Sequence, residues 1–181
     1  MKEATAVCEA GPLMALAKLG VLSKVFSVYT LLTISETVYH EAVVSGLAIG
    51  ARDAAEIDNF CQSKKIVIFP PNEIKEVSLD MSSELHQGEL ETIRISLRLS
   101  ADYVFIDDFD ARQVAEGNFQ KLSADTTIKG TLGILVELYQ KKLISKSQLK
   151  EYLEEIMRRK DIWISSKLCQ KLIEAVNEEV L

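Results

Sequence analysis

The chain has 181 residues, which is enough for one well-packed domain and barely enough for two. Hydrophobic residues make up 48% of it and charged residues 27%, an ordinary composition for a soluble globular protein. With 21 basic and 27 acidic residues the net charge is −6, which argues against a large nucleic-acid footprint but leaves a small substrate groove open.

The cysteines and the apolar runs indicate where the protein works. Cys8, Cys61 and Cys169 are odd in number and lack the spacing of a metal site, so we expect reduced thiols in a cytoplasmic protein. The opening MKEATAV carries an acid and no long apolar run. Charged or polar residues also interrupt the longer apolar stretches, so we expect neither a secretory leader nor a membrane span.

Short apolar runs alternate with amphipathic stretches along the chain. Four runs are typical of strands, at residues 4–8, 29–34, 66–69 and 103–106, and residues 121–124 are a candidate for a short fifth. Helical spacing favours helices that include residues 36–44, 51–61, 111–117, 147–160 and 166–180, with Gly46 ending the first of these. Thr126 or Thr127 is expected to cap the helix that contains TLGILVELYQKK. The alternation predicts an α/β fold of three layers, α/β/α, with a mainly parallel central sheet.

Acidic residues occur where the predicted strands end. Glu9 follows the first strand, Glu41 lies on the helix after the second, Glu89 opens the helix before the fourth, and Asp107 and Asp108 leave the fourth. The carboxyl ends of parallel strands share one edge, so we expect these side chains to meet there. Carboxylates in a shared site repel one another unless cations neutralise them. Without a Cys or His cluster beside them, oxygen ligands point to Mg²⁺ or Mn²⁺.

Each of these acids also has an ordinary structural interpretation, because charged residues are usually surface features. Glu9 would be a loop acid, Glu41 a solvated helix residue, Glu89 an acid that suits the positive end of a helix dipole, and Asp107 or Asp108 a helix cap. The two interpretations differ in whether the side chains converge.

Other polar candidates carry a weaker signal. The segment GTLG at residues 130–133 lacks the Lys of a phosphate loop, so we expect its glycines to allow close helix packing and Thr131 to line the site. Arg94, Arg98 and Arg112 either form a solvated helix face or steer phosphates towards the acids. The apolar spacing in residues 147–160 indicates packing against the domain or an oligomer contact.

The order of these motifs resembles that of PIN-domain proteins. The segments that carry the resemblance are VCEAGPLM from residue 7, SETVYHE from residue 35, GELETI from residue 88, FIDD from residue 105 with the following AR at 111–112, and GTLGIL from residue 130. They are most similar to prokaryotic PIN-like proteins with a Gly-Glu-x-Glu-Ala-Ile helix start and a Gly-Thr-x-Gly-Ile-Leu segment. The resemblance covers nearly the whole chain. It implies a PIN-like domain at residues 1–145 and a helical extension at 146–181 that packs on the same domain.

The resemblance implies an Mg²⁺- or Mn²⁺-dependent ribonuclease that hydrolyses phosphodiesters with a metal-activated water. The expected partners are RNA, an antitoxin protein if the chain is the toxin of a toxin–antitoxin pair, and a second copy of the chain; no membrane is expected. Carried over by position, the catalytic acids are Glu9, Glu41, Glu89 and Asp108; the metal ligands are Glu9, Glu89, Asp107 and Asp108; and the substrate contacts are Thr131 and Arg112.

One residue departs from the family pattern. The first motif of the family usually ends in Asp, whereas this chain has Glu9, whose side chain is one methylene longer. Mg²⁺ requires near-ideal octahedral geometry, so the extra methylene can misplace a ligand. The alternative hypothesis is therefore a PIN-like scaffold with weak or lost catalysis that binds RNA or protein.

Overall fold

Five parallel strands form one sheet in the order β3-β2-β1-β4-β5. The computed structural model describes residues 4–74 and 77–178. The strands are β1 (Thr5–Cys8), β2 (Leu31–Ser35), β3 (Ile66–Phe69), β4 (Tyr103–Phe105) and β5 (Thr127–Lys129). The predicted α/β fold with a mainly parallel sheet is confirmed.

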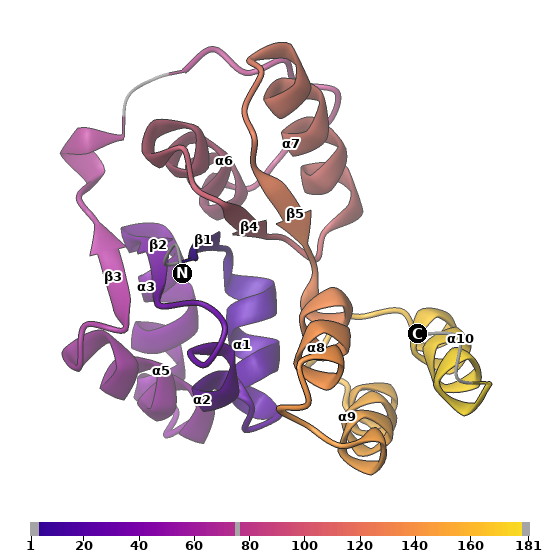
Figure 1. Cartoon of the computed structure of the whole chain (residues 1–181). Coiled ribbons are helices and arrows are strands. Elements are labelled where there is room, and N and C mark those ends of the chain that lie inside the picture. Colours follow the sequence, from indigo (N-terminus) through magenta and orange to yellow (C-terminus); the bar gives the residue numbers. More distant parts are fainter. Residues whose placement is uncertain (1–3, 75–76, 179–181) are drawn as a thin grey trace.

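Helices cover both faces of this sheet (Figure 1). They are α1 (Ala10–Lys18), α2 (Leu22–Val25), α3 (Glu36–Tyr39), the π-helix η1 (His40–Val44), α4 (Ser45–Ala48), α5 (Arg52–Gln62), the 3-10 helix η2 (Pro71–Glu73), α6 (Gln87–Leu99), α7 (Phe109–Lys121), α8 (Thr131–Gln140), α9 (Lys146–Arg158) and α10 (Ser166–Asn177). No helix within the described ranges is long and apolar enough to cross a bilayer.

Alternating side chains of the strands build two apolar layers. Ala6 and Cys8 face one layer and Val7 faces the other, as the period of two in a strand requires. Side chains of α6 and α7 fill the layer on Val7, whereas α1, α5 and α8 fill the opposite one. The inner strands β1, β2 and β4 are buried on both faces, whereas the edge strand β3 exposes Val67 and Ile68. All four are largely apolar runs, and this made them recognisable in the sequence.

The order in which strands are added to the sheet reverses at β1. It passes from β1 through β2 to β3, and then returns to place β4 on the other side of β1. In register, Cys8 lies opposite Phe105, and the Glu9 amide donates a hydrogen bond to the Phe105 carbonyl (3.1 Å). The segments that leave β1 and β4 therefore start side by side at a topological switch point, where open α/β sheets leave a crevice for ligands.

The C-terminal helices belong to the same packing. Leu149, Leu153 and Ile156 of α9 are fully or almost fully buried in the layer that contains Cys8, and α10 packs on α9. The apolar stripe predicted at residues 147–160 thus packs on its own chain. The last helix was expected to reach Val180; that end lies outside the described residues.

Two local predictions near β5 were wrong. Residues 121–124 do not form a strand: α7 continues to Lys121 because Phe119 is buried on its inner face, and Ser123 then takes a left-handed conformation (φ 52°). The fifth strand starts later, at Thr127, and α8 is capped by Gly130, so neither Thr126 nor Thr127 caps it.

The helical segment after β2 is longer than predicted. It runs from Glu36 to Ala48 and includes Gly46, which was expected to end it. A Cβ atom at Gly46 would lie 2.5 Å from the Cβ atom of Ala54 on α5. This glycine is therefore required for the close approach of α4 to α5 and not for a helix end.

Candidate active site

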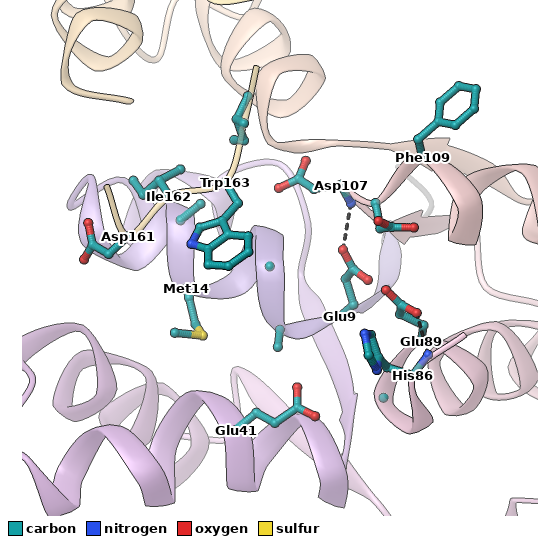
Figure 2. A pocket seen from close by; sticks show the side chains of 16 residues that line it. Glu9, Met14, Glu41, His86, Glu89, Asp107, Phe109, Asp161, Ile162 and Trp163 are labelled. Atoms are coloured by element: carbon teal, nitrogen blue, oxygen red, sulfur yellow. Dashed lines mark hydrogen bonds between the residues drawn. The ribbon is translucent and has the colours of Figure 1, made fainter. Parts of the chain in front are cut away.

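A cavity of about 550 Å³ opens where β1 and β4 end (Figure 2). Carboxylates from several elements line it: Glu9, Glu41, Glu89, Asp107, Asp108 and Asp161. The first five are the acids that the sequence placed at this edge. Apolar side chains of α1 and of the segment after α9 form another part of the wall.

Glu9, at the start of α1, is the most deeply placed acid. Only 6% of the residue is exposed, and its Oε1 accepts a hydrogen bond from the Asp107 backbone amide (2.7 Å). Burial raises the pKa of the Glu9 carboxyl to about 8, although hydrogen bonds from the Asp107 and Asp108 amides oppose the shift, and the negative charges of Asp107 and Glu89 add to it. The side chain of Glu9 thus contacts the backbone of the segment that follows β4.

The carboxylate of Asp107 joins the end of β4 to the start of α8. Its Oδ1 accepts from the Thr131 amide (2.7 Å) and its Oδ2 from the Thr131 hydroxyl (2.5 Å). Burial raises the pKa of Asp107, while these hydrogen bonds and the positive charge of Arg112 oppose the rise. Thr131 is fully buried, and neither it nor Arg112 is among the residues that line the cavity. Thr131 therefore positions Asp107 through two hydrogen bonds, and Arg112 acts on Asp107 through its charge.

Gly130 is required at this junction. A Cβ atom there would lie 2.8 Å from Oδ1 of Asp107 and 3.0 Å from a terminal nitrogen of Arg112. By contrast, a Cβ atom at Gly133 would meet nothing within 4 Å. The expectation that both glycines of this motif serve close helix packing is therefore wrong for Gly133.

Asp108 faces outward from the same turn. It is the N-cap of α7, where its Oδ1 accepts from the Ala111 amide (2.8 Å), and the residue is exposed. Adjacent in sequence, the two acids differ in setting: Asp107 is held by Thr131 inside the protein, whereas Asp108 is open to the cavity and solvent.

Glu89 lies in the first turn of α6 and caps it. Its Oε2 accepts from the His86 backbone amide (2.8 Å), so that the carboxylate stands at the positive end of the helix. Loss of water in the cavity raises the pKa of Glu89, as do the charges of Asp108 and Asp110, against the effects of the His86 amide and ring.

Glu41 extends from the π-helix η1 on another wall (Figure 2). A π-helix shifts the side chains that follow it relative to an α-helix, and such turns are frequent at functional sites. Desolvation and the charges of Glu89 and Glu91 raise the pKa of Glu41, and the His86 ring lowers it. The charges of acids on α6 therefore act on the carboxyl group of Glu41 on η1.

A family model for the PIN domain matches residues 5–178. The chain belongs to the PIN-domain family. No curated protein and no solved structure showed significant similarity to it. The resemblance seen in the motifs is thereby confirmed. For this chain, family membership supports a nuclease-type fold with the cavity at its switch point.

The donor types of this PIN domain fit a divalent cation. Carboxylate oxygens are the ligands that Mg²⁺ and Mn²⁺ prefer. Within the ranges 4–74 and 77–178, no three Asp, Glu, His or Cys side chains form a ready ligand group. Asp108 and Glu89 each use one oxygen as a helix cap, and among the described residues the second oxygen of each carboxylate makes no hydrogen bond to a cap amide.

Several cavity residues of the PIN domain were missed in the sequence. They come from α1, from the residue before α6 and from the segment after α9, and are Met14, His86, Asp161, Ile162, Trp163 and Ile164. The segment after α9 follows the fourth strand by more than fifty residues, and no local pattern indicates that it returns to the cavity. The signal available was the single Trp of the chain, flanked by two isoleucines.

Proposed function

We propose that this cavity is the active site of an Mg²⁺- or Mn²⁺-dependent endoribonuclease. The observation that carries the proposal is that the carboxylates of Glu9, Glu41, Glu89 and Asp108 come from four separate segments to one cavity. Mutual repulsion disfavours the convergence of these charges unless a cation neutralises them, and burial already raises the pKa of three of the four. Such an arrangement is typical of a site that binds a cation.

The residues divide into ligands and supports. Asp108, Glu89 and Glu9 would hold the ion, and Asp107 is a further ligand candidate. A divalent ion bound there supplies a water of lowered pKa and neutralises charge on the phosphate. Thr131 fixes the side chain of Asp107 through two hydrogen bonds. The backbone amide of the same residue donates to the Glu9 carboxylate, so Thr131 also helps to place Glu9.

Glu9 adds proton exchange to this site. With a pKa raised to about 8, the carboxyl is mostly protonated at neutral pH in the metal-free protein. Ion binding requires the carboxylate and therefore releases this proton. We expect the metal affinity of the site to rise with pH between about 6 and 9.

RNA is the substrate that we propose, on the resemblance to PIN-domain ribonucleases. We further propose that the chain is the toxin of a toxin–antitoxin pair in the cytoplasm. A second copy of the chain is the remaining partner in this hypothesis. The RNA and toxin–antitoxin proposals rest on the family resemblance alone. The second copy was expected from the apolar spacing of residues 147–160, whose buried side chains pack on their own chain.

The alternative is a PIN-like scaffold that binds RNA or protein without efficient cleavage. The observation in its favour is Glu9, whose longer side chain is tied to backbone amides and is almost fully buried. In this hypothesis the cavity would bind no Mn²⁺ at millimolar concentration.

Calorimetric titration with Mn²⁺ separates the two hypotheses. We expect saturable binding to the wild type and a loss of about tenfold or more in affinity for Glu89→Gln, because Gln removes the charge and still caps α6. Glu116→Gln, an exposed acid on α7, is the matched control and should bind as the wild type does. Absence of binding to the wild type would contradict the proposal and favour the scaffold.

A further inference from the structure

Trp163 lies at the cavity with its side chain in solvent. The residue is 93% exposed, although it lines the same cavity as Glu9 and Asp108. Figure 2 shows the indole between Met14 and Asp107. An indole usually stabilises a protein by burying its large apolar surface, and Trp163 contributes almost none of that stabilisation.

The backbone on both sides of Trp163 is anchored. Ile162 is 7% exposed, and Ile164 packs partly buried on the same apolar layer, so in this extended segment the residue between them points outward. Asp161 is held by Lys18, which donates to its carbonyl (2.9 Å) and lies 3.2 Å from its Oδ2. The outward position of the indole therefore follows from packing of its neighbours.

A second clamp fixes Asp161 itself. The guanidinium of Arg159 donates to both carboxylate oxygens, with distances of 2.9 and 2.8 Å. These hydrogen bonds, together with the charges of Arg159 and Lys18, lower the pKa of Asp161 to about 2. Asp161 is thus neutralised by its partners and does not add to the repulsion of an incoming phosphate.

The charge of the surrounding segment differs from that of the rest of the chain. Residues 141–171, which we call the basic arm, contain nine Lys or Arg and four Asp or Glu, a net charge of +5, whereas the remaining residues carry −11. Lys167 and Lys171 of the arm are exposed on α10, and Arg158 is exposed with its guanidinium 2.8 Å from the carboxylate of Glu155. A basic segment with an exposed aromatic is the combination that binds single-stranded nucleic acid through phosphates and stacked bases.

We propose that Trp163 is a base-stacking platform that holds a nucleotide of single-stranded RNA at the mouth of the acidic cavity, with the basic arm binding the adjoining phosphates. The inference deepens the proposed function and rests on it for the identity of the substrate. The bare carboxylates repel RNA, so attraction in the absence of metal comes from the indole and the arm. Stacking requires an accessible base face, which a duplex does not offer.

Because Trp163 is the single Trp of the chain, the intrinsic tryptophan fluorescence of the protein reports on this site alone. In EDTA, which prevents metal-dependent cleavage, titration with a ten-residue oligoadenylate should quench the intrinsic fluorescence of Trp163 saturably. An abasic ribose-phosphate oligomer of the same length and a ten-base-pair RNA duplex should quench it much less. Equal quenching by the abasic oligomer, or none by the oligoadenylate, would overturn the proposal.

Variants test the same contact through a labelled oligoadenylate and its fluorescence anisotropy. Because a stacked base contributes about 1–3 kcal/mol, Trp163→Ala should weaken binding about 5- to 150-fold. Trp163→Phe should retain part of the affinity. Leu122→Ala, which truncates a half-exposed apolar residue at the far end of α7, is the control and should bind as the wild type does. An affinity of Trp163→Ala within twofold of the wild type would refute the stacking role.

This binding assay is independent of catalysis. If Trp163→Ala cleaves RNA and binds the oligoadenylate with the affinity of the wild type, the stacking inference is refuted and the ribonuclease proposal stands. Quenching of the wild type and weaker binding of the labelled oligoadenylate by Trp163→Ala, without any metal-dependent cleavage by the wild type, would support the stacking inference and refute the ribonuclease proposal.

Discussion

Both carboxylate oxygens of Asp107 accept hydrogen bonds from Thr131, one from its amide and one from its hydroxyl. This pair ties the end of β4 to the first turn of α8, and it depends on the absence of a side chain at Gly130. The Asp107 amide in turn holds Glu9. The position of the deepest acid in the cavity is therefore set from α8, a helix that contributes no lining residue of its own.

Gly130→Ala tests this dependence. The new Cβ atom would lie 2.8 Å from Oδ1 of Asp107, so the Asp107–Thr131 pair has to shift. We expect a loss of about 1–3 kcal/mol in the free energy of unfolding, measured in urea, together with weaker Mn²⁺ binding. Gly133→Ala, in the same helix with open space around it, should gain about 0.5–1 kcal/mol. Equal effects of the two substitutions would contradict the account.

Glu9 makes the stability of the metal-free protein depend on pH. Its pKa in the folded state, about 8, lies above its ordinary value of 4.5, so the folded state binds the proton more tightly than the unfolded chain does. The stabilisation from this proton is complete below pH 4.5 and is lost as the pH rises through 8.

Glu9→Gln should remove this dependence. Gln keeps an oxygen acceptor for the Asp107 amide and carries no charge. In EDTA, the free energy of unfolding of the wild type should fall more steeply than that of the variant as the pH rises from 5 to 8. The difference between the two slopes should be up to about 1.4 kcal/mol per pH unit. Glu116→Gln should show the slope of the wild type. Parallel curves for the wild type and Glu9→Gln would refute the raised pKa.

A partly buried polar cluster away from the cavity gives a separate stability prediction. Lys129 of β5 donates to Glu137 (2.6 Å) and to the hydroxyl of the fully buried Tyr29 (3.0 Å), and Tyr29 donates to Glu137. Lys129→Met leaves the carboxylate of Glu137 without its main cation and should cost about 3 kcal/mol in urea unfolding. Adding Glu137→Gln removes the uncompensated charge, so the double variant should recover more than half of that loss. A double variant less stable than Lys129→Met would argue against an ion pair in this cluster.

The sequence predicted most of the sheet because four of the five strands are largely apolar runs. Runs such as residues 66–69 and 103–106 are apolar throughout, and parallel pairing then brings the acids that follow them to one edge. The fifth strand was misplaced because Thr127–Lys129 is short and polar. Residues 121–124 are no more polar than a strand edge, and the burial of Phe119, which keeps α7 helical up to Lys121, is a tertiary effect.

The site was predictable only in part. Acids at strand ends indicated the cavity. Because Asp107 and Asp108 are adjacent in the sequence, the sequence did not show which of the two is the ligand. Their separation depends on Thr131, which meets Asp107 only because β4 and β5 pair in parallel. Trp163 was not recognised, since its place at the cavity depends on how α9 packs and on the clamp around Asp161.

The central claim is that the cavity cleaves RNA with a divalent ion, and Asp108→Asn tests it most directly. Asn removes the charge that holds the ion but caps a helix as well as Asp does, so α7 and the fold should be retained. Asp125→Asn, an exposed acid beyond the amino end of β5, is the matched control. The measurement is the rate of Mn²⁺-dependent cleavage of a labelled single-stranded RNA by purified protein. We predict cleavage by the wild type and Asp125→Asn and a loss of at least about 100-fold in Asp108→Asn. Cleavage that persists in Asp108→Asn, or a wild type that does not cleave with Mn²⁺, would contradict the claim.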